Sequence, residues 1–280
     1  MADPREANRP SRERRESRNE PRLGPACAQA LLAELPPGIH GVREIAGALR
    51  LSIREVGADG FEGALIRAKD LAMGAIVVRE SIREAGRKNF TIAHEIGHFV
   101  LPSHDRVSLA CTAAEVGDWS DVPAGRKFER EADEFAAELL MPASAVEAAG
   151  KDVMPSLRVI EKIAQVSGAS LSAAAWRYCD LSAEKCAVVW STDGAIQWVK
   201  RSAGFPFFLP REKPVRLGSF AAACFAGERV PSWPRSVSAH LWISATNPDT
   251  SVPMLEQSKA LPSYRSVITL LWIGEEEEHR

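Results

Sequence analysis

The chain has 280 residues, enough to bury one sizeable hydrophobic core or two modest ones. Hydrophobic residues make up 45% of the chain and charged residues 26%, which is ordinary for a soluble globular protein. The formal net charge of −2 gives no electrostatic case for direct binding of nucleic acid.

Cysteine usage and the lack of long apolar runs predict a cytoplasmic protein that does not contact a membrane. The cysteines are odd in number and form no Cys-x-x-Cys pair, so we interpret them as reduced thiols rather than disulfides or a structural zinc site. No apolar run approaches the length of a transmembrane helix, and the N-terminal residues contain no apolar signal core. The five cysteines are Cys27, Cys111, Cys179, Cys186 and Cys224.

Residues 1–24 form an arginine-rich tail of mixed charge with prolines and almost no large apolar side chains. Such a segment cannot bury enough surface to offset the entropy lost on ordering, so we expect it to be disordered. An arm that binds nucleic acid is the alternative, but four glutamates dilute the positive charge.

Two helices and three strands are expected next, at residues 26–35, 42–49, 51–56, 64–67 and 75–79. The last two strands form a β-hairpin. We interpret the strand at 75–80 as a candidate edge to which an extended peptide could add. The alternative is that this strand only covers the core.

The stretch His94-Glu95-Ile96-Gly97-His98 carries the strongest chemical signal in the chain. Residues four apart share one face of a helix, so His94 and His98 can reach the same metal ion. Zinc accepts imidazole nitrogen readily, and a catalytic zinc site needs only three protein ligands. Glu95 can then take a proton from the water molecule at the open position. The apolar spacing around the motif predicts a helix that begins near residues 89–91 and ends at Leu101-Pro102.

The favoured third ligand is Glu129, on a predicted helix at residues 127–141. Glu129 and Asp133 are four apart on one face of this helix. One carboxylate can bind the metal while the other accepts the remaining N–H of a ligand histidine. We interpret three further acidic residues of this helix as a solvated face. They are Glu131, Glu134 and Glu138.

His104 is the second candidate for the third ligand, six residues after His98. An all-histidine site of that kind has a glycine where this chain has Leu101, which favours Glu129. The segment from residue 103 to 125 is long for a loop in a compact domain. Our hypothesis is a lid over the cleft, with His104 or Trp119 near the substrate.

Taken together, two segments resemble the ImmA/IrrE family of metallopeptidases. They are Phe90-Thr91-Ile92-Ala93-His94-Glu95-Ile96-Gly97-His98 and Glu129-x-x-Ala132-Asp133-x-Phe135-Ala136-x-x-Leu139-Leu140-Met141-Pro142. The resemblance covers roughly residues 25–180 and implies a zincin-like α+β fold, in which a short sheet or hairpin accompanies the metal-binding helices.

The resemblance also implies a role for each matching residue. It makes His94, His98 and Glu129 the zinc ligands and Glu95 the catalytic base, and Asp133 stands where the family has Asn or Asp. Many members carry a further histidine directly after the leucine, where this chain has Pro102. The implied substrate is a helix-turn-helix repressor of the XRE type, whose cleavage switches on genes of a mobile element or a stress response.

The composition changes after about residue 183, where five of the seven tryptophans occur. The chain is therefore predicted to comprise the tail at 1–24, the metallopeptidase domain at 25–182 and a smaller α+β or mainly β domain at 183–280. In that last part we expect strands at 187–190 and 195–199, joined by a glycine turn, and at 240–244 and 267–273. We expect this domain to regulate the peptidase or to dock its substrate.

The predicted function is therefore that of a zinc-dependent endopeptidase acting on a protein. The alternative is a zinc-bound binding or sensor module that captures a repressor or toxin without cleaving it. Glu95 argues against this alternative, because a purely structural zinc site has no use for a base.

Overall fold

The computed structural model describes residues 22–67, 73–104, 110–111, 127–151, 153–243 and 252–274. The chain divides into two compact units, one of residues 1–80 with 91–139 and the other of residues 81–90 with 140–280. Each unit combines helices with one β-sheet, which confirms the predicted α+β class with a second, sheet-rich C-terminal region. The domain boundary expected at residue 182 stays a prediction. Among the described residues, no helix has the length and apolarity needed to cross a membrane.

The first sheet comprises β1 (Leu51–Val56), β2 (Gly63–Arg67), β3 (Gly74–Arg79) and β4 (Ala110–Cys111), in the order β1-β3-β2-β4. β2 and β3 form the predicted antiparallel hairpin. β1 pairs in parallel with the other side of β3. The prediction that β3 is an edge strand is therefore wrong, because both of its sides are paired and Ile76 and Val78 are fully buried.

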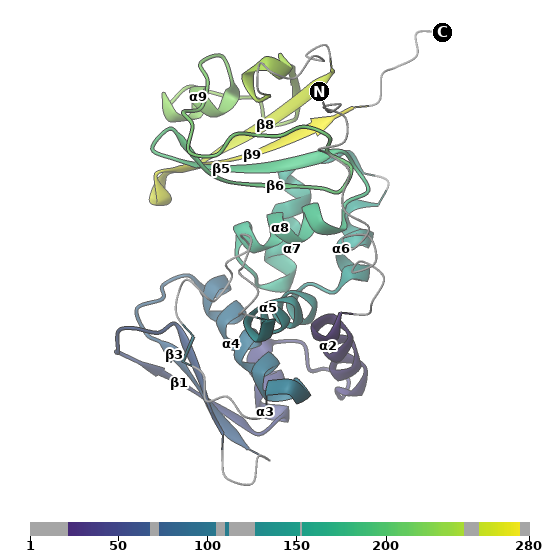
Figure 1. The fold of residues 1–280 in the computed structure, drawn as a ribbon, viewed down its shortest axis with the longest axis vertical. Coiled ribbons are helices and arrows are strands. Elements are labelled where there is room, and N and C mark those ends of the chain that lie inside the picture. The colour runs from purple at the N-terminus through teal and green to yellow at the C-terminus, as the bar shows by residue number, and fades with distance from the viewer. Residues whose placement is uncertain are drawn as a thin grey trace, which may run out of the picture. The chain divides into compact units, whose positions relative to one another are not determined.

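Four helices of the first unit lie on one side of this sheet (Figure 1). They are α2 (Leu23–Glu34), α3 (Val42–Ala48), the part of α4 (Ala85–Val100) from residue 91 onward, and α5 (Lys127–Leu140). α4 begins at Ala85, earlier than predicted, and the backbone N–H of Lys88 donates to the oxygen of Glu84 (3.0 Å) in its first turn. Asn89 therefore lies inside the helix, and its side chain donates to the carbonyl oxygen of Gly168 (2.9 Å). Pro102 ends α4 as predicted and opens the short 3-10 turn η2 (Pro102–His104).

α4 and α5 cross at very close range. A Cβ atom added at Gly97 would lie 3.1 Å from Cδ1 of Phe135 and 3.3 Å from Cα of Ala132. A side chain at this position would require these neighbours to give by a few tenths of an ångström, so glycine suits the close approach. The crossing lays the face of α4 that carries His94 and His98 against the beginning of α5.

α2 packs against α5 at a second glycine. A Cβ atom on Gly24 would lie 2.4 Å from the backbone oxygen of Glu131 and 2.9 Å from the backbone nitrogen of Phe135. These are backbone atoms, which cannot rotate away as a flexible side chain can. Gly24 therefore fixes how closely α2 covers α5.

The second unit contains α6 (Ala143–Gly150), α7 (Leu157–Ser167), α8 (Leu171–Leu181) and α9 (Phe220–Phe225). Its sheet has the order β6-β5-β9-β8-β7, and α8 and α9 lie on opposite faces of it (Figure 1). Alternate residues of one strand serve the two faces. Val188 packs with α7 and α8, whereas Val189 packs in the cluster that includes Ala221 of α9. The strands are β5 (Cys186–Thr192), β6 (Ala195–Arg201), β7 (Arg235–Val237), β8 (Met254–Leu261) and β9 (Ser266–Ile273).

One strand prediction in this unit is wrong. Residues 239–241 form the 3-10 turn η3 (Ala239–Leu241), and the adjacent Trp242 and Ile243 are both buried. A half-buried strand would expose one of two neighbouring residues. The Trp242 ring donates from Nε1 to the buried carboxylate of Glu256 on β8 (2.9 Å), which anchors the turn to the sheet. A further 3-10 turn, η4 (Pro262–Tyr264), joins β8 to β9.

Two predictions fall outside the described residues. They are the disordered tail up to residue 21 and most of the lid with Trp119.

Gly24→Ala should destabilise the first unit, because the new methyl group would overlap the backbone of α5. Overpacking of this kind costs about 1–3 kcal/mol. Gly47→Ala is the matched control, since a Cβ at this exposed helical position meets nothing within 4 Å. Urea unfolding followed by circular dichroism should show a lower midpoint for Gly24→Ala only. Equal midpoints in the two variants would contradict the packing argument.

Candidate metal centre

His94 and His98 come from successive turns of α4 and lie side by side in the interior. His94 is fully buried and His98 is 1% exposed. Their Nε2 atoms are 3.0 Å apart, and their ring centroids are 4.7 Å apart in an edge-on arrangement. Two ring nitrogens with lone pairs directed towards the same small space are an arrangement that a shared cation explains.

Glu129, in the first turn of α5, supplies a third donor atom. Its Oε2 is 3.2 Å from Nε2 of His94 and 3.6 Å from Nε2 of His98. Tetrahedral ligands with bonds of about 2.0 Å would be separated by about 3.3 Å, close to these distances. The residues present therefore fit a metal ion, and this trio is the group of possible ligands among the described residues.

The other ring nitrogen of His94 contacts Asp133. Nδ1 of His94 lies 2.8 Å from Oδ1 of Asp133, whose residue is only 7% exposed. A carboxylate cannot donate, so the proton of the neutral His94 ring resides on Nδ1 and leaves the lone pair on Nε2. Asp133 thus lies where the sequence placed the group that orients a ligand histidine.

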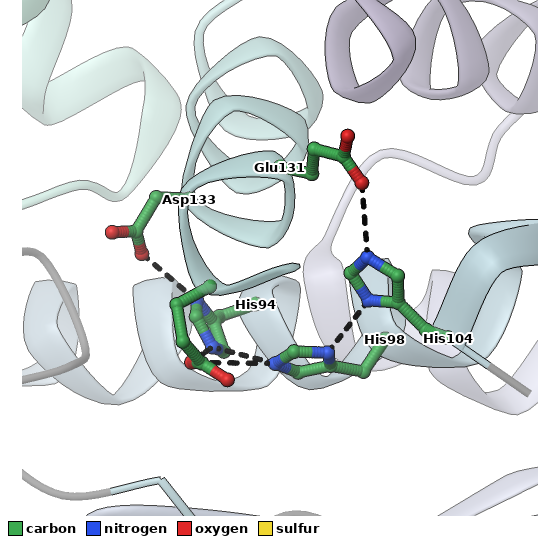
Figure 2. Close-up of polar contacts among 6 residues, drawn as sticks. His94, His98, His104, Glu131 and Asp133 are labelled. Atoms are coloured by element: carbon green, nitrogen blue, oxygen red, sulfur yellow. Dashed lines mark hydrogen bonds and ion pairs between the residues drawn. The ribbon is translucent and has the colours of Figure 1, made fainter. Parts of the chain in front are cut away.

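His98 has an orienting contact of its own, to His104. The Nδ1 atoms of the two rings are 2.8 Å apart, and Nε2 of His104 lies 3.2 Å from Oε2 of Glu131 (Figure 2). His104 is 1% exposed, so its side chain lies inside the unit. Its predicted contact with a substrate stays a prediction.

The interpretation of Glu131 and Glu138 as a solvated helix face is wrong. Glu131 is 7% exposed and Glu138 is 3% exposed. Glu138 accepts a hydrogen bond from the side chain of Gln29 on α2 (3.0 Å). Figure 2 shows Glu131 and Asp133 leaving α5 on opposite sides, each directed at a different histidine. The sequence argument ranked Glu131 below Glu129 as a metal ligand because it shares its face with no useful partner, whereas in the structure Glu131 contacts His104.

Glu95 lies beneath the start of β2. Its side chain is fully buried, and a Cβ atom on Gly63 would lie 2.6 Å from Oε1 of Glu95. At the other end of β2, the Arg67 guanidinium donates from Nη2 to the backbone oxygen of His98. β2 therefore runs along α4 from Glu95 to His98. Sequence reasoning missed Gly63 and Arg67, because neither residue has a signal until the strand is placed over the helix.

The sequence comparison agrees with this geometry. Residues 48–178, which include all of these groups, match the Peptidase M78 family, described as the IrrE N-terminal-like domain. This segment belongs to the ImmA/IrrE family. The family suggests a peptidase whose activity depends on a metal ion, and the trio of His94, His98 and Glu129 supplies a place for one.

A solved structure of a Mycobacterium tuberculosis transcriptional regulator is also similar to the chain. The two are 13% identical, with a TM-score of 0.51 over 90% of this chain and 76% of the other. At such low identity the likeness shows the fold alone. No curated protein matches the sequence.

Protonation states in the ImmA/IrrE segment suit metal binding. Burial lowers the pKa of His98 to about 4, so its ring is neutral near pH 7. Burial raises the pKa of Glu129, but hydrogen bonds to His94 and His98 and their charges outweigh this effect and hold its pKa well below the usual range. Glu129 is then ionised at neutral pH. A neutral imidazole and a carboxylate are the forms that bind a cation.

Metal binding should stabilise the protein measurably. A ligand at 100 times its Kd raises the free energy of unfolding by about 2.7 kcal/mol.

Glu129→Gln should lower the affinity for zinc at least tenfold, because it removes the only anionic donor of the trio. Glu134→Gln is the control on the same helix, since that carboxylate pairs with Arg22 and Arg130 instead. Competition against a chromophoric chelator measures the zinc affinity of each variant. Equal affinities in the two variants would contradict the assignment of Glu129 as a ligand.

Proposed function

We propose that the protein is a zinc-dependent endopeptidase that hydrolyses a peptide bond in a helix-turn-helix repressor of the XRE type. The observation that carries the proposal is a trio of two buried histidines and the half-buried Glu129, with Glu95 next to His94 on α4. Zinc suits two imidazoles and a carboxylate with a fourth position left for water. The ImmA/IrrE match over residues 48–178 supports the peptidase class.

In this mechanism the protein holds the reacting groups and moves one proton. A bound zinc ion would polarise the scissile carbonyl and lower the pKa of a water molecule at the site towards 7. The Glu95 carboxylate accepts a proton from that water as it attacks the carbonyl carbon, then passes it to the leaving amine. Asp133 keeps His94 in the tautomer whose Nε2 faces the site. The Gly63 end of β2 packs against Glu95 and limits its motion.

The first sheet suggests where an extended substrate lies. β4 pairs with β2 only at Gly63 and Ala64. Among the described residues, no strand pairs with Leu65 or Ile66 on the side away from β3, and Ile66 is 57% exposed. A peptide added along this edge would run past the part of α4 that carries Glu95 and His98. Main-chain pairing of this kind binds a polypeptide without demanding one sequence.

A transcriptional repressor is the proposed substrate because the resemblance to the ImmA/IrrE family implies a repressor target. The protein itself is not proposed to bind DNA, because its formal net charge of −2 gives no electrostatic case for it. Action on a repressor, in a stress response or as the switch of a mobile element, places the protein in the cytoplasm.

Glu95→Gln should keep its zinc and lose cleavage, since it removes the base but no metal ligand. General base catalysis contributes about 100-fold to 10,000-fold, so the rate should fall at least 100-fold. The assay incubates the zinc-loaded protein with purified helix-turn-helix repressors encoded next to its gene and follows fragments by mass spectrometry. Glu129→Gln should lose both zinc and cleavage. Equal loss of zinc in the two variants, or co-purification with a repressor that is never cut, would contradict the proposal.

Ile66→Asp should weaken substrate binding without changing the affinity for zinc. A charge on the exposed edge of β2 would oppose an apolar residue of the substrate strand, so KM should rise about tenfold while kcat changes little. Leu217→Asp is the control, an equally drastic change at a residue that is 90% exposed in the other unit. Unchanged KM in Ile66→Asp would contradict the proposed binding edge.

A further inference from the structure

His98 is held through both of its ring nitrogens. Nε2 faces the Nε2 atom of His94 (3.0 Å) and Oε2 of Glu129 (3.6 Å). Nδ1 lies on the opposite side of the ring, 2.8 Å from Nδ1 of His104. Two neutral nitrogens at this distance require one donor and one acceptor.

The metal site decides which nitrogen donates. A neutral imidazole that offers the lone pair of Nε2 to a cation carries its proton on Nδ1, so His98 donates to His104. Nδ1 of His104 is then the acceptor, and the proton of the neutral His104 ring must lie on Nε2. That N–H points at Oε2 of Glu131, 3.2 Å away. The chain of three residues allows one consistent arrangement of protons.

Local sequence explains why His104 is in place to accept. Pro102 ends α4, and the 3-10 turn η2 is closed by a hydrogen bond from the backbone N–H of His104 to the oxygen of Leu101 (3.0 Å). Leu101 is fully buried and anchors the turn. The turn carries the His104 ring back over the last turn of α4. There it packs between His98 and the ring of Phe128, with centroids 4.9 and 5.0 Å away.

Glu131 completes the chain from the other helix. Its side chain is largely buried, and its Oε1 lies 3.5 Å from the exposed ammonium group of Lys127 one turn earlier on α5. A buried carboxylate is an acceptor and never a donor while ionised. It therefore fixes the tautomer of His104, and through it the tautomer of His98.

We propose that His104 and Glu131 are positioning residues that hold His98 in the ring orientation and tautomer needed for metal binding. This inference rests on the proposed metal site. His104 and Glu131 would orient His98 as Asp133 orients His94, but through two residues in series instead of one. Loss of such a partner behind a ligand histidine typically lowers metal affinity by about 10-fold to 100-fold.

The tautomers can be observed directly in the full-length protein. In the zinc-loaded protein labelled with 15N-histidine, long-range 1H–15N spectra should show His98 protonated on Nδ1 and His104 protonated on Nε2 only. A proton on Nδ1 of His104 would overturn the inference, because that nitrogen could then not accept from His98.

Zinc affinity provides the second test, with variants of matched shape. His104→Phe keeps a ring against Phe128 but removes the acceptor, and Glu131→Leu removes the last acceptor of the chain. Both should raise the Kd for zinc about 10-fold to 100-fold, whereas Glu131→Gln, whose amide oxygen still accepts, should remain within a few-fold of the wild type. Glu134→Gln is the control without a role in the chain.

The thermal midpoint of each zinc-free variant shows whether that variant is folded. If His104→Phe is not folded, the zinc affinity of Glu131→Leu alone tests the positioning role. Unchanged affinity in a folded variant would overturn the positioning role while leaving the proposed function intact. A wild-type protein that binds no zinc would instead contradict the proposed function together with this inference.

Discussion

The close crossing of α4 and α5 at Gly97 is the constraint on which the candidate site depends. The histidines belong to α4 and the carboxylates to α5, so no local interaction brings them together. At Gly97 the absence of a side chain lets the ring of Phe135 and the backbone of Ala132 approach the helix directly. A side chain here would require these neighbours to give by a few tenths of an ångström, in an interior that is close-packed.

The sequence could predict which side chains share a face within each helix of this crossing, but not how the elements pack together. His94 and His98 share a face through helical spacing alone, and Glu129 with Asp133 follows the same rule on the second helix. Gly63 and Glu131 could not be predicted, because their contacts depend on how β2 lies on α4 and on which sides of α5 reach the site. The spacing of residues along the sequence indicates which side chains share a face of a helix. It does not indicate which other elements of the fold contact that face.

The second unit shows the same limit in its sheet. β5, β6 and β9 were predicted, since their apolar residues give a clear strand pattern. β8 was missed because its centre is polar yet buried. There the carboxylate of Glu256 accepts from the backbone of Ala221 (2.7 Å), and Ser258 shares a hydrogen bond with Thr269 of β9 (2.8 Å). Burial of such residues is tolerated only when partners from distant segments are present, and the sequence of β8 does not contain those partners.

The first two turns of α5 bring three carboxylates to the site. Glu129 lies in the first turn of the helix, where the helix dipole favours negative charge, and Glu131 and Asp133 follow in the second turn. Glu129 contacts both α4 histidines, whereas Asp133 and Glu131 accept from His94 and His104. The same short segment thus starts the helix, supplies one donor atom of the group that could hold a metal ion and places carboxylates behind two histidine rings. Because the three carboxylates contact different ring nitrogens, their negative charges are spread around the site instead of repelling one another at a single point.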